Sequence, residues 1–496
     1  MTTQQPVVAL LLTRLLTGRP SLRLAWVLLM AWAGLLGLQL AEIQRFRIAP
    51  SDLLLALLAI TMVVRERATL VVAIRRWTPI HTALVALLVA LIWGSVIAIV
   101  RTGVLLRDAW LNKDLGWLVL ALTVICVLGL VKTTADVRTM LRALLVGGSA
   151  VTWLAATLTI NSHLTSGVAS DLRFQGFLLN PSAEALYVSV LIVVQVASAY
   201  GRGIVDWPKW LQLLNAGALM AVLLATLSRS SWVATLAALT VTGLFSLRQT
   251  KVPLVLAFVL LLFVGAPLVE AIRPVATQVA SGQEPATLRD RTPLGTPPPD
   301  LQEFASAIPT QATSTESTTP IPSTSAGPPF SPAPLPTASP EGLGSYVSDA
   351  TTVASEQYGA SDRLALDVIA IRLWLSSPSM ALTGIGNGVF LQISPYTPIG
   401  ASLGIHSTYV WLPVEMGIAG LVALIAFAVA GMWSMRRVLQ QADFDLVMLF
   451  LGVGVLFAVW IAINEGLYQR TLWLALSLAV VVGATAGSSN RKKAGK

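Results

Sequence analysis

The chain has 496 residues, of which 55% are hydrophobic and 11% are charged, and its formal net charge is +9 at pH 7. Because soluble proteins carry about 25% charged residues, this composition excludes an ordinary soluble domain and predicts an all-α, polytopic membrane protein. Positive-inside bias accounts for most of the net charge, so no nucleic-acid partner is expected.

Apolar runs divide the chain into candidate membrane spans. A spanning helix needs about 20 mainly apolar residues, and about twelve candidate runs occur. They start near Leu22, Asp52, Ala83, Leu115, Met140, Ala183, Leu211, Trp232, Val252, Thr408, Phe444 and Leu472. The first run is too long for a signal-peptide core and lacks a small-residue cleavage site after it, so we expect a retained helix.

The distribution of charge predicts the orientation of these spans. Arginine and lysine concentrate in alternate connecting segments, which predicts that both termini are cytoplasmic. The predicted parts are a bundle of about nine spans, a large extracytoplasmic loop, a bundle of about three spans and a basic cytoplasmic tail. Their boundaries are 1–272, 273–405, 406–487 and 488–496.

The extracytoplasmic loop contains a biased segment at about 282–344, dominated by Pro, Thr, Ser and Ala. Such a segment buries too little apolar surface to offset the entropy of ordering, so we predict a disordered insertion. Helical order is expected to return at about 361–390, where Ser361 can cap a helix that runs through about Leu375.

Two arginines of this predicted helix are candidates for a functional role. Arg363 and Asp367 are four residues apart, which predicts a surface ion pair worth little. Arg363 and Arg372 are nine residues apart and point to opposite sides of an ideal helix, so at most one of them should be functional.

Arg229 and His406 lie at boundaries between polar and apolar segments. Because an arginine at the centre of an inserted helix costs about 2.5 to 3.5 kcal/mol, Arg229 should face an anion or reach lipid phosphates. His406 is one of three histidines and is either a titratable functional group or a helix cap. With Arg173 and Arg363 on the same predicted face, an anionic lipid headgroup or a lipid diphosphate fits these side chains. No metal or cofactor motif occurs in the sequence.

The run from His406 to Gly420 resembles the signature of the O-antigen ligase and polymerase superfamily, with Glu415 nine residues after the histidine. Ser407 replaces the usual asparagine, and Asp367 stands where an aromatic residue is common. Further features match in the family order: the segment Arg173 to Gly176 followed by Asn180-Pro181, the turn at Arg229, the Arg363 helix, and Gly384-Ile-Gly386-Asn-Gly388-Val-Phe390. A long stretch between Pro378 and Gly384 leaves Arg372 as the alternative to Arg363.

The resemblance implies a GT-C-type transferase of the cytoplasmic membrane. It would move a glycan from a polyprenyl diphosphate carrier to an acceptor hydroxyl of a lipid or glycan on the outer face, without metal or nucleotide. His406 would be the catalytic base, and Arg173, Arg229 and Arg363 would hold the diphosphate. Supporting residues are Glu415, Gly384 and Gly386, which orient the site and cradle phosphate or simply pack helices together.

Three alternatives stay open. A polymerase of the same superfamily would lengthen the glycan on its carrier, and a secondary transporter would line an anion path with arginines. The third is a structural protein of an envelope assembly whose insertion reaches into the wall. His406→Ala is expected to abolish glycan transfer if the protein is a ligase or a polymerase. It should have no effect on a structural protein.

Overall fold

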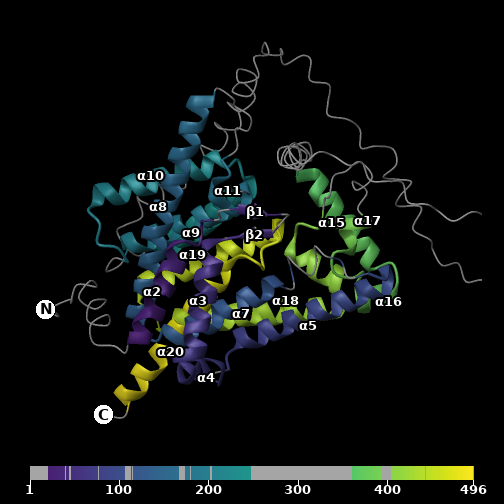
Figure 1. The fold of residues 1–496 in the computed structure, drawn as a ribbon, viewed down its shortest axis with the longest axis horizontal. Helices are drawn as coiled ribbons and strands as arrows, with labels where there is room; N and C mark the ends of the chain where they lie inside the picture. The colour runs from purple at the N-terminus through teal and green to yellow at the C-terminus, as the bar shows by residue number, and fades with distance from the viewer. Residues whose placement is uncertain are drawn as a thin grey trace, which may run out of the picture.

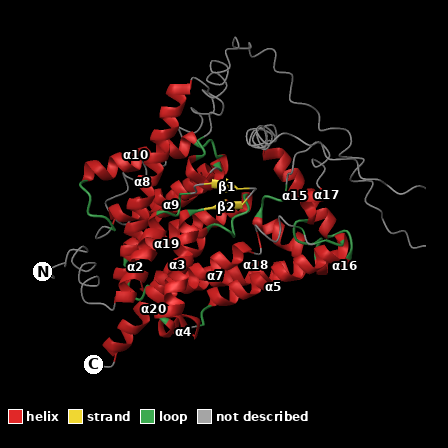
Figure 2. Ribbon diagram, viewed as in Figure 1, coloured by secondary structure: helices red, strands yellow, loops and turns green. Residues whose placement is uncertain are grey.

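The computed structural model describes residues 20–38, 41–43, 46–75, 77–104, 106, 113, 115–166, 174–178, 180–200, 204–246, 360–393, 404–441 and 443–494. These residues form a helical bundle with one short hairpin (Figure 1, Figure 2). The predicted insertion at 282–344, the apolar run near Val252 and Arg173 lie outside the described residues.

The first half of the described chain is a series of helices. They are α2 (Pro20–Gly34), α3 (Pro50–Arg65), α4 (Arg67–Arg75), α5 (Pro79–Thr102), α7 (Leu115–Leu130), α8 (Thr134–Ser166), α9 (Pro181–Tyr200), α10 (Lys209–Ala225) and α11 (Arg229–Ser246). A 3₁₀ turn, η2 (Gly176–Leu178), precedes α9. Between α2 and α3, strands β1 (Ala41–Ile43) and β2 (Phe46–Ile48) pair antiparallel, with Glu42 opposite Arg47.

The second half contains three helices before the final spans. These are α15 (Ala360–Trp374), α16 (Pro378–Thr383) and α17 (Val389–Ile393), and α15 occupies the place of the helix expected from Ser361. They are followed by α18 (Thr408–Gln441), α19 (Phe444–Ile463) and α20 (Arg470–Ala494). In Figure 1, α15 and α16 lie against the right-hand end of the long α5 and α18 pair, and both helices pack against α18.

Five described helices are long and apolar enough to cross a membrane. Within them the spans are Pro79–Thr102, Thr134–Asn161, Pro181–Ala199, Thr408–Gln440 and Phe444–Ile463. Shorter apolar helices cover Leu24–Gly34, Gly116–Leu130, Lys209–Ala225 and Arg470–Thr485. Each predicted span start among the described residues lies in a helix. The chain is therefore a helical protein of membrane-embedded character, and the number of twelve crossings stays a prediction.

The helix boundaries follow from local sequence. Proline occupies the first turn of α3, α5, α9 and α16, where its missing N–H group has no partner to lose. The Asn180 side chain caps α9, because its Oδ1 accepts the N–H groups of Ser182 and Ala183 at 2.9 and 3.1 Å. Gly103, with φ of 74°, ends α5 in the left-handed conformation that glycine adopts without strain.

Small residues bring the helices close together. A Cβ atom built on Gly147 of α8 would lie 2.5 Å from the Gly34 Cα of α2, so these two backbones are in contact. At the centre of the bundle, α19 packs against α9, α11, α18 and α20. Most residues of α19 are buried, so packing fixes the position of this helix. The polar groups at its C-terminal end are therefore held in place as well.

Candidate functional site

Contacts between connecting segments divide the bundle into two ends. At the end that contains His406, called the His406 end below, Arg470 pairs with Asp52 at 2.6 Å. The opposite end contains the start of α19, where Arg138 of α8 lies 2.8 Å from Asp445.

The helix α18 is bent near its start. Pro413 has no N–H group to donate, and Gly417 has φ of 60° and ψ of −140°, far from helical values. The carbonyl groups of Val414 and Glu415 therefore turn toward the glycine loop, residues 384–388, and accept two of its N–H groups at 2.9 Å. The bend fixes the glycine loop against α18.

The N–H groups of the glycine loop are engaged by acceptors within the protein. The Asn387 N–H donates to the Gly94 carbonyl of α5 at 2.9 Å, and the Gly388 N–H donates to the Glu415 carboxylate at 2.9 Å. The Gly384 N–H completes the last turn of α16. Of the two roles considered for these glycines, this geometry favours packing over a phosphate cradle.

A partly buried cluster of charges lies beside the glycine loop. Lys113 Nζ lies 3.3 Å from a carboxylate oxygen of Glu415 and 3.3 Å from one of Glu465. Trp411 donates its indole N–H to Glu415 at 2.6 Å, and the Lys113 ammonium lies 4.2 Å from the centre of the Trp411 ring. Burial alone would lower the pKa of Lys113, but the attraction of Glu415 and Glu465 outweighs it and raises this pKa.

His406 is half-buried in the segment that leads into α18. Two residues later, the Thr408 hydroxyl donates to the Asn464 carbonyl at 3.0 Å and accepts the Gly466 N–H at 2.9 Å. Asn464 and Gly466 flank Glu465 in the turn between α19 and α20. This turn therefore sets the position of the backbone that carries His406.

Asp367 of α15 lies near the same segment. Burial raises the pKa of its carboxyl group to about 6, although the nearby backbone N–H groups of His406 and Ser407 act in the opposite direction. The surface ion pair predicted between Arg363 and Asp367 stays a prediction, because the side chain of Arg363 lies outside the described part of the chain. The helix α15 packs against α18.

Arg229 is exposed and is the first residue of α11. In the same turn, the Ser231 hydroxyl accepts the indole N–H of Trp460 at 3.0 Å. Trp460 lies one helical turn before Asn464 on α19. The Arg229 turn and the His406 segment therefore both rest on the C-terminal end of α19.

The remaining predicted arginines are only partly placed. Arg173 lies outside the described residues, but the neighbouring Phe174 donates its N–H to the Ala225 carbonyl at 2.9 Å, next to the Arg229 turn. The backbone of Arg363 lies one turn before Asp367 on α15. The alternative arginine, Arg372, is exposed further along the same helix.

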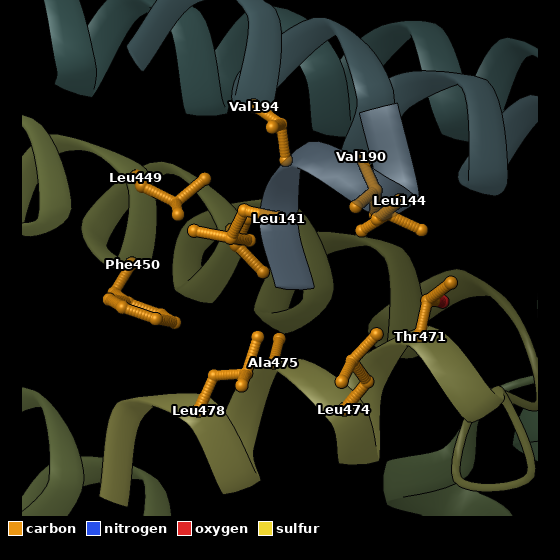
Figure 3. Close-up of a pocket in the computed structure, with 11 residues that line it drawn as sticks. Leu141, Leu144, Val190, Val194, Leu449, Phe450, Thr471, Leu474, Ala475 and Leu478 are labelled. Atoms are coloured by element: carbon orange, nitrogen blue, oxygen red, sulfur yellow. The ribbon is translucent and has the colours of Figure 1, made fainter. Parts of the chain in front are cut away.

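A narrow apolar crevice lies inside the bundle between α8, α9, α19 and α20 (Figure 3). Leucine and valine side chains line most of it, and Thr471 is the polar residue at its edge. The predicted site residues do not line this crevice. Among the described residues, no three His, Cys, Asp or Glu side chains gather closely enough to hold a metal ion.

The sequence did not identify Lys113 and Trp411 as part of the site. Lys113 is the last basic residue before an apolar run, which is an unremarkable position in a membrane protein. Its partners Glu415 and Glu465 are distant in the sequence, and Glu415 lies 302 positions after Lys113. The available signal was Glu415 in an otherwise apolar part of α18, because a buried acid needs a cation.

No protein-family model matches the chain, and a search of curated proteins finds no significant match.

Proposed function

We propose that this chain is a membrane glycan transferase of the O-antigen ligase type. It moves a glycan from a polyprenyl diphosphate carrier to an acceptor hydroxyl on the outer face of the cytoplasmic membrane. The observation that carries the proposal is the shared support of the His406 segment and the Arg229 turn by the C-terminal end of α19. The sequence resemblance supports the same function.

The chemistry needs one base and one group that stabilises an anion. His406 takes the proton from the acceptor hydroxyl while that oxygen bonds to the anomeric carbon of the donor. The bond between this carbon and the diphosphate oxygen breaks, and negative charge develops on the leaving polyprenyl diphosphate. Arg229, with Arg173 and Arg363, stabilises this charge. An imidazole has an ordinary pKa of about 6.5, which suits a base that contributes roughly 10² to 10⁴ in rate.

The distribution of basic residues supports an outer location for the His406 end. Arg138 and Arg142 lie at the opposite end, where Arg142 donates to the Ile204 carbonyl at 2.7 Å. Arg436 lies near the C-terminal end of α18, far along this helix from His406. Arginine-rich ends face the cytoplasm in most membrane proteins, so the His406 end is assigned to the outer face.

The test is glycan transfer by purified protein in proteoliposomes, with a polyprenyl diphosphate glycan as donor and without added metal. His406→Ala and Arg229→Ala should each lose at least about 100-fold in rate. Arg436→Ala is the matched control for Arg229→Ala, because it removes an exposed arginine from the opposite end and should keep full activity. Equal activity of His406→Ala and wild type would contradict the proposed role of the histidine.

The product distinguishes the alternatives. A single addition to acceptor indicates a ligase, and a ladder of lengthened carrier-linked glycans indicates a polymerase. Absence of product from wild type with native donor and acceptor extracts would contradict transfer. Uptake of the anionic donor into vesicles under those conditions would then favour a transporter.

A further inference from the structure

Lys113 joins more segments of the His406 end than its place in the sequence suggests. It lies between α5 and α7, and its ammonium group reaches Glu415 on α18 and Glu465 between α19 and α20, each at 3.3 Å. Through Glu415 it is also linked to the glycine loop, because this carboxylate accepts the Gly388 N–H. One cation therefore connects four parts of the chain.

The cluster has one positive and two negative charges. The exposed fractions of the side chains are 17% for Lys113, 4% for Glu415 and 32% for Glu465, so water screens the two carboxylates only in part. Without the ammonium group, the two carboxylates would repel each other in a poorly hydrated site. The α19–α20 turn and the start of α18 would then be pushed apart.

His406 lies next to both elements. Glu465 stands between Asn464 and Gly466, and both of these residues bind the Thr408 hydroxyl, two positions after the histidine. A displacement of the turn is therefore transmitted to the segment that bears the imidazole. Glu415 lies on the same helix as Thr408, before the bend at Gly417.

We propose that Lys113 is a positioning residue for the transfer reaction: by joining Glu415 to Glu465, it holds the α19–α20 turn against the start of α18 and so fixes the place of His406. This inference rests on the proposed function. Lys113 does not touch the reacting atoms in this proposal, and it acts through Thr408 and the backbone.

Kinetics provide the first test. Lys113→Met should lower kcat by about 10- to 100-fold, because displacement of a reacting group by 1 Å can cost about 100-fold in rate. The KM for the donor should stay within about twofold, since the diphosphate-binding arginines are unchanged. Lys113→Arg restores the charge and can bridge both carboxylates, so it should recover most of the rate. Lys209→Met, at an exposed lysine that starts α10, should behave as wild type.

Cysteine labelling provides a second readout that needs no catalysis. The chain has a single cysteine, Cys126, which is 1% exposed, so a cysteine placed at position 406 is the accessible thiol. The rate of maleimide labelling of His406→Cys should change at least about threefold when Lys113→Met is added, and it should not change with Lys113→Arg or Lys209→Met.

Glu465→Gln keeps the one-to-one ion pair between Lys113 and Glu415. This variant is therefore a milder perturbation of the cluster, and it can be studied if Lys113→Met folds poorly. The loss of kcat caused by Lys113→Met should be at least about threefold smaller in the Glu465→Gln background. The proposal is overturned if Lys113→Met lowers kcat by the same factor in the wild-type and Glu465→Gln backgrounds. It is also overturned if Lys113→Met has the kcat of wild type and leaves the labelling rate unchanged. Absence of transfer by wild type contradicts the proposed function instead, and the labelling rates then decide whether Lys113 positions residue 406.

Discussion

Gly384 and Gly417 lie backbone to backbone: a Cβ atom built on Gly384 would be 2.4 Å from the Gly417 nitrogen, and one built on Gly417 would be 2.3 Å from the Leu382 carbonyl oxygen. Their φ angles are 76° and 60°, which favour glycine. The glycine loop can approach the bend of α18 only because both residues lack a side chain. This contact places Gly388 within reach of Glu415.

Alanine at either glycine should therefore destabilise the protein. Backbone strain and steric overlap together should lower the free energy of unfolding by about 2 to 6 kcal/mol in Gly384→Ala and in Gly417→Ala. Equilibrium unfolding of the purified protein in mixed micelles measures this change.

Gly431 is the matched control in the same helix, because a Cβ atom there would meet no atom within 4 Å. Gly431→Ala should leave stability unchanged or raise it by up to about 1 kcal/mol. Stability of Gly384→Ala equal to that of Gly431→Ala would show that the glycine loop does not need its contact with α18.

The ion pairs at the opposite end differ in burial, and their contributions should differ accordingly. Asp445 is 2% exposed and lies 2.8 Å from Arg138, whereas the Asp206 side chain is 77% exposed and lies 3.6 Å from Arg142. Asp445→Ala leaves a partly buried guanidinium with one remaining acid and should cost about 3 to 5 kcal/mol. Asp206→Ala should cost at most about 1 kcal/mol.

The same micelle unfolding experiment compares these two aspartate variants, each of which shortens one acid to alanine. A cost below about 1 kcal/mol for Asp445→Ala would mean that Asp443, which also lies 2.9 Å from Arg138, replaces the lost partner.

Much of the helical pattern was predictable because it depends on local sequence. Apolar runs, first-turn prolines and the Asn180 cap fix where helices begin, and these signals lie within a few residues of each boundary. The bend of α18 was not predicted, although proline and glycine, here Pro413 and Gly417, are residues at which helices commonly bend.

The contacts within the site were less predictable because they join distant segments. The pattern of α15 showed Asp367 four residues after Arg363 but could not show that its carboxylate lies near the backbone of His406. Likewise, the position of Lys113 between two carboxylates depends on how α5, α18 and α19 pack. Charge pairing across 302 positions leaves no periodic signal in one sequence.

Stability should depend on pH through Asp367. Its pKa is raised from an ordinary value of about 3.9 to about 6 in the folded protein. The folded state therefore holds this proton more tightly, so the stabilising contribution is complete below about pH 4 and is lost as the pH rises through about 6. Wild type should lose stability over this range relative to Asp367→Asn, whose side chain has a similar shape and does not titrate.

Measurement of the unfolding free energy of both proteins from about pH 4 to pH 7 isolates Asp367, because other titrating groups contribute equally to each. Asp206→Asn, at an exposed aspartate, controls for removal of one charge. A difference between wild type and Asp367→Asn that stays constant across this range would contradict the burial argument.

The proposed orientation of the bundle predicts which exposed thiols a membrane-impermeant maleimide can reach. Ser376 lies in the exposed turn between α15 and α16, and Gln440 is exposed near the far end of α18. In intact cells whose outer face is accessible, Ser376→Cys should be labelled, whereas Gln440→Cys should be labelled only after the membrane is opened. The buried Cys126 of the unmodified protein provides the background measurement. Because α18 contains about 33 residues between His406 and its end, the two thiols should lie on opposite sides of the bilayer. Labelling of Gln440→Cys but not Ser376→Cys in intact cells would reverse the orientation and place His406 on the cytoplasmic face.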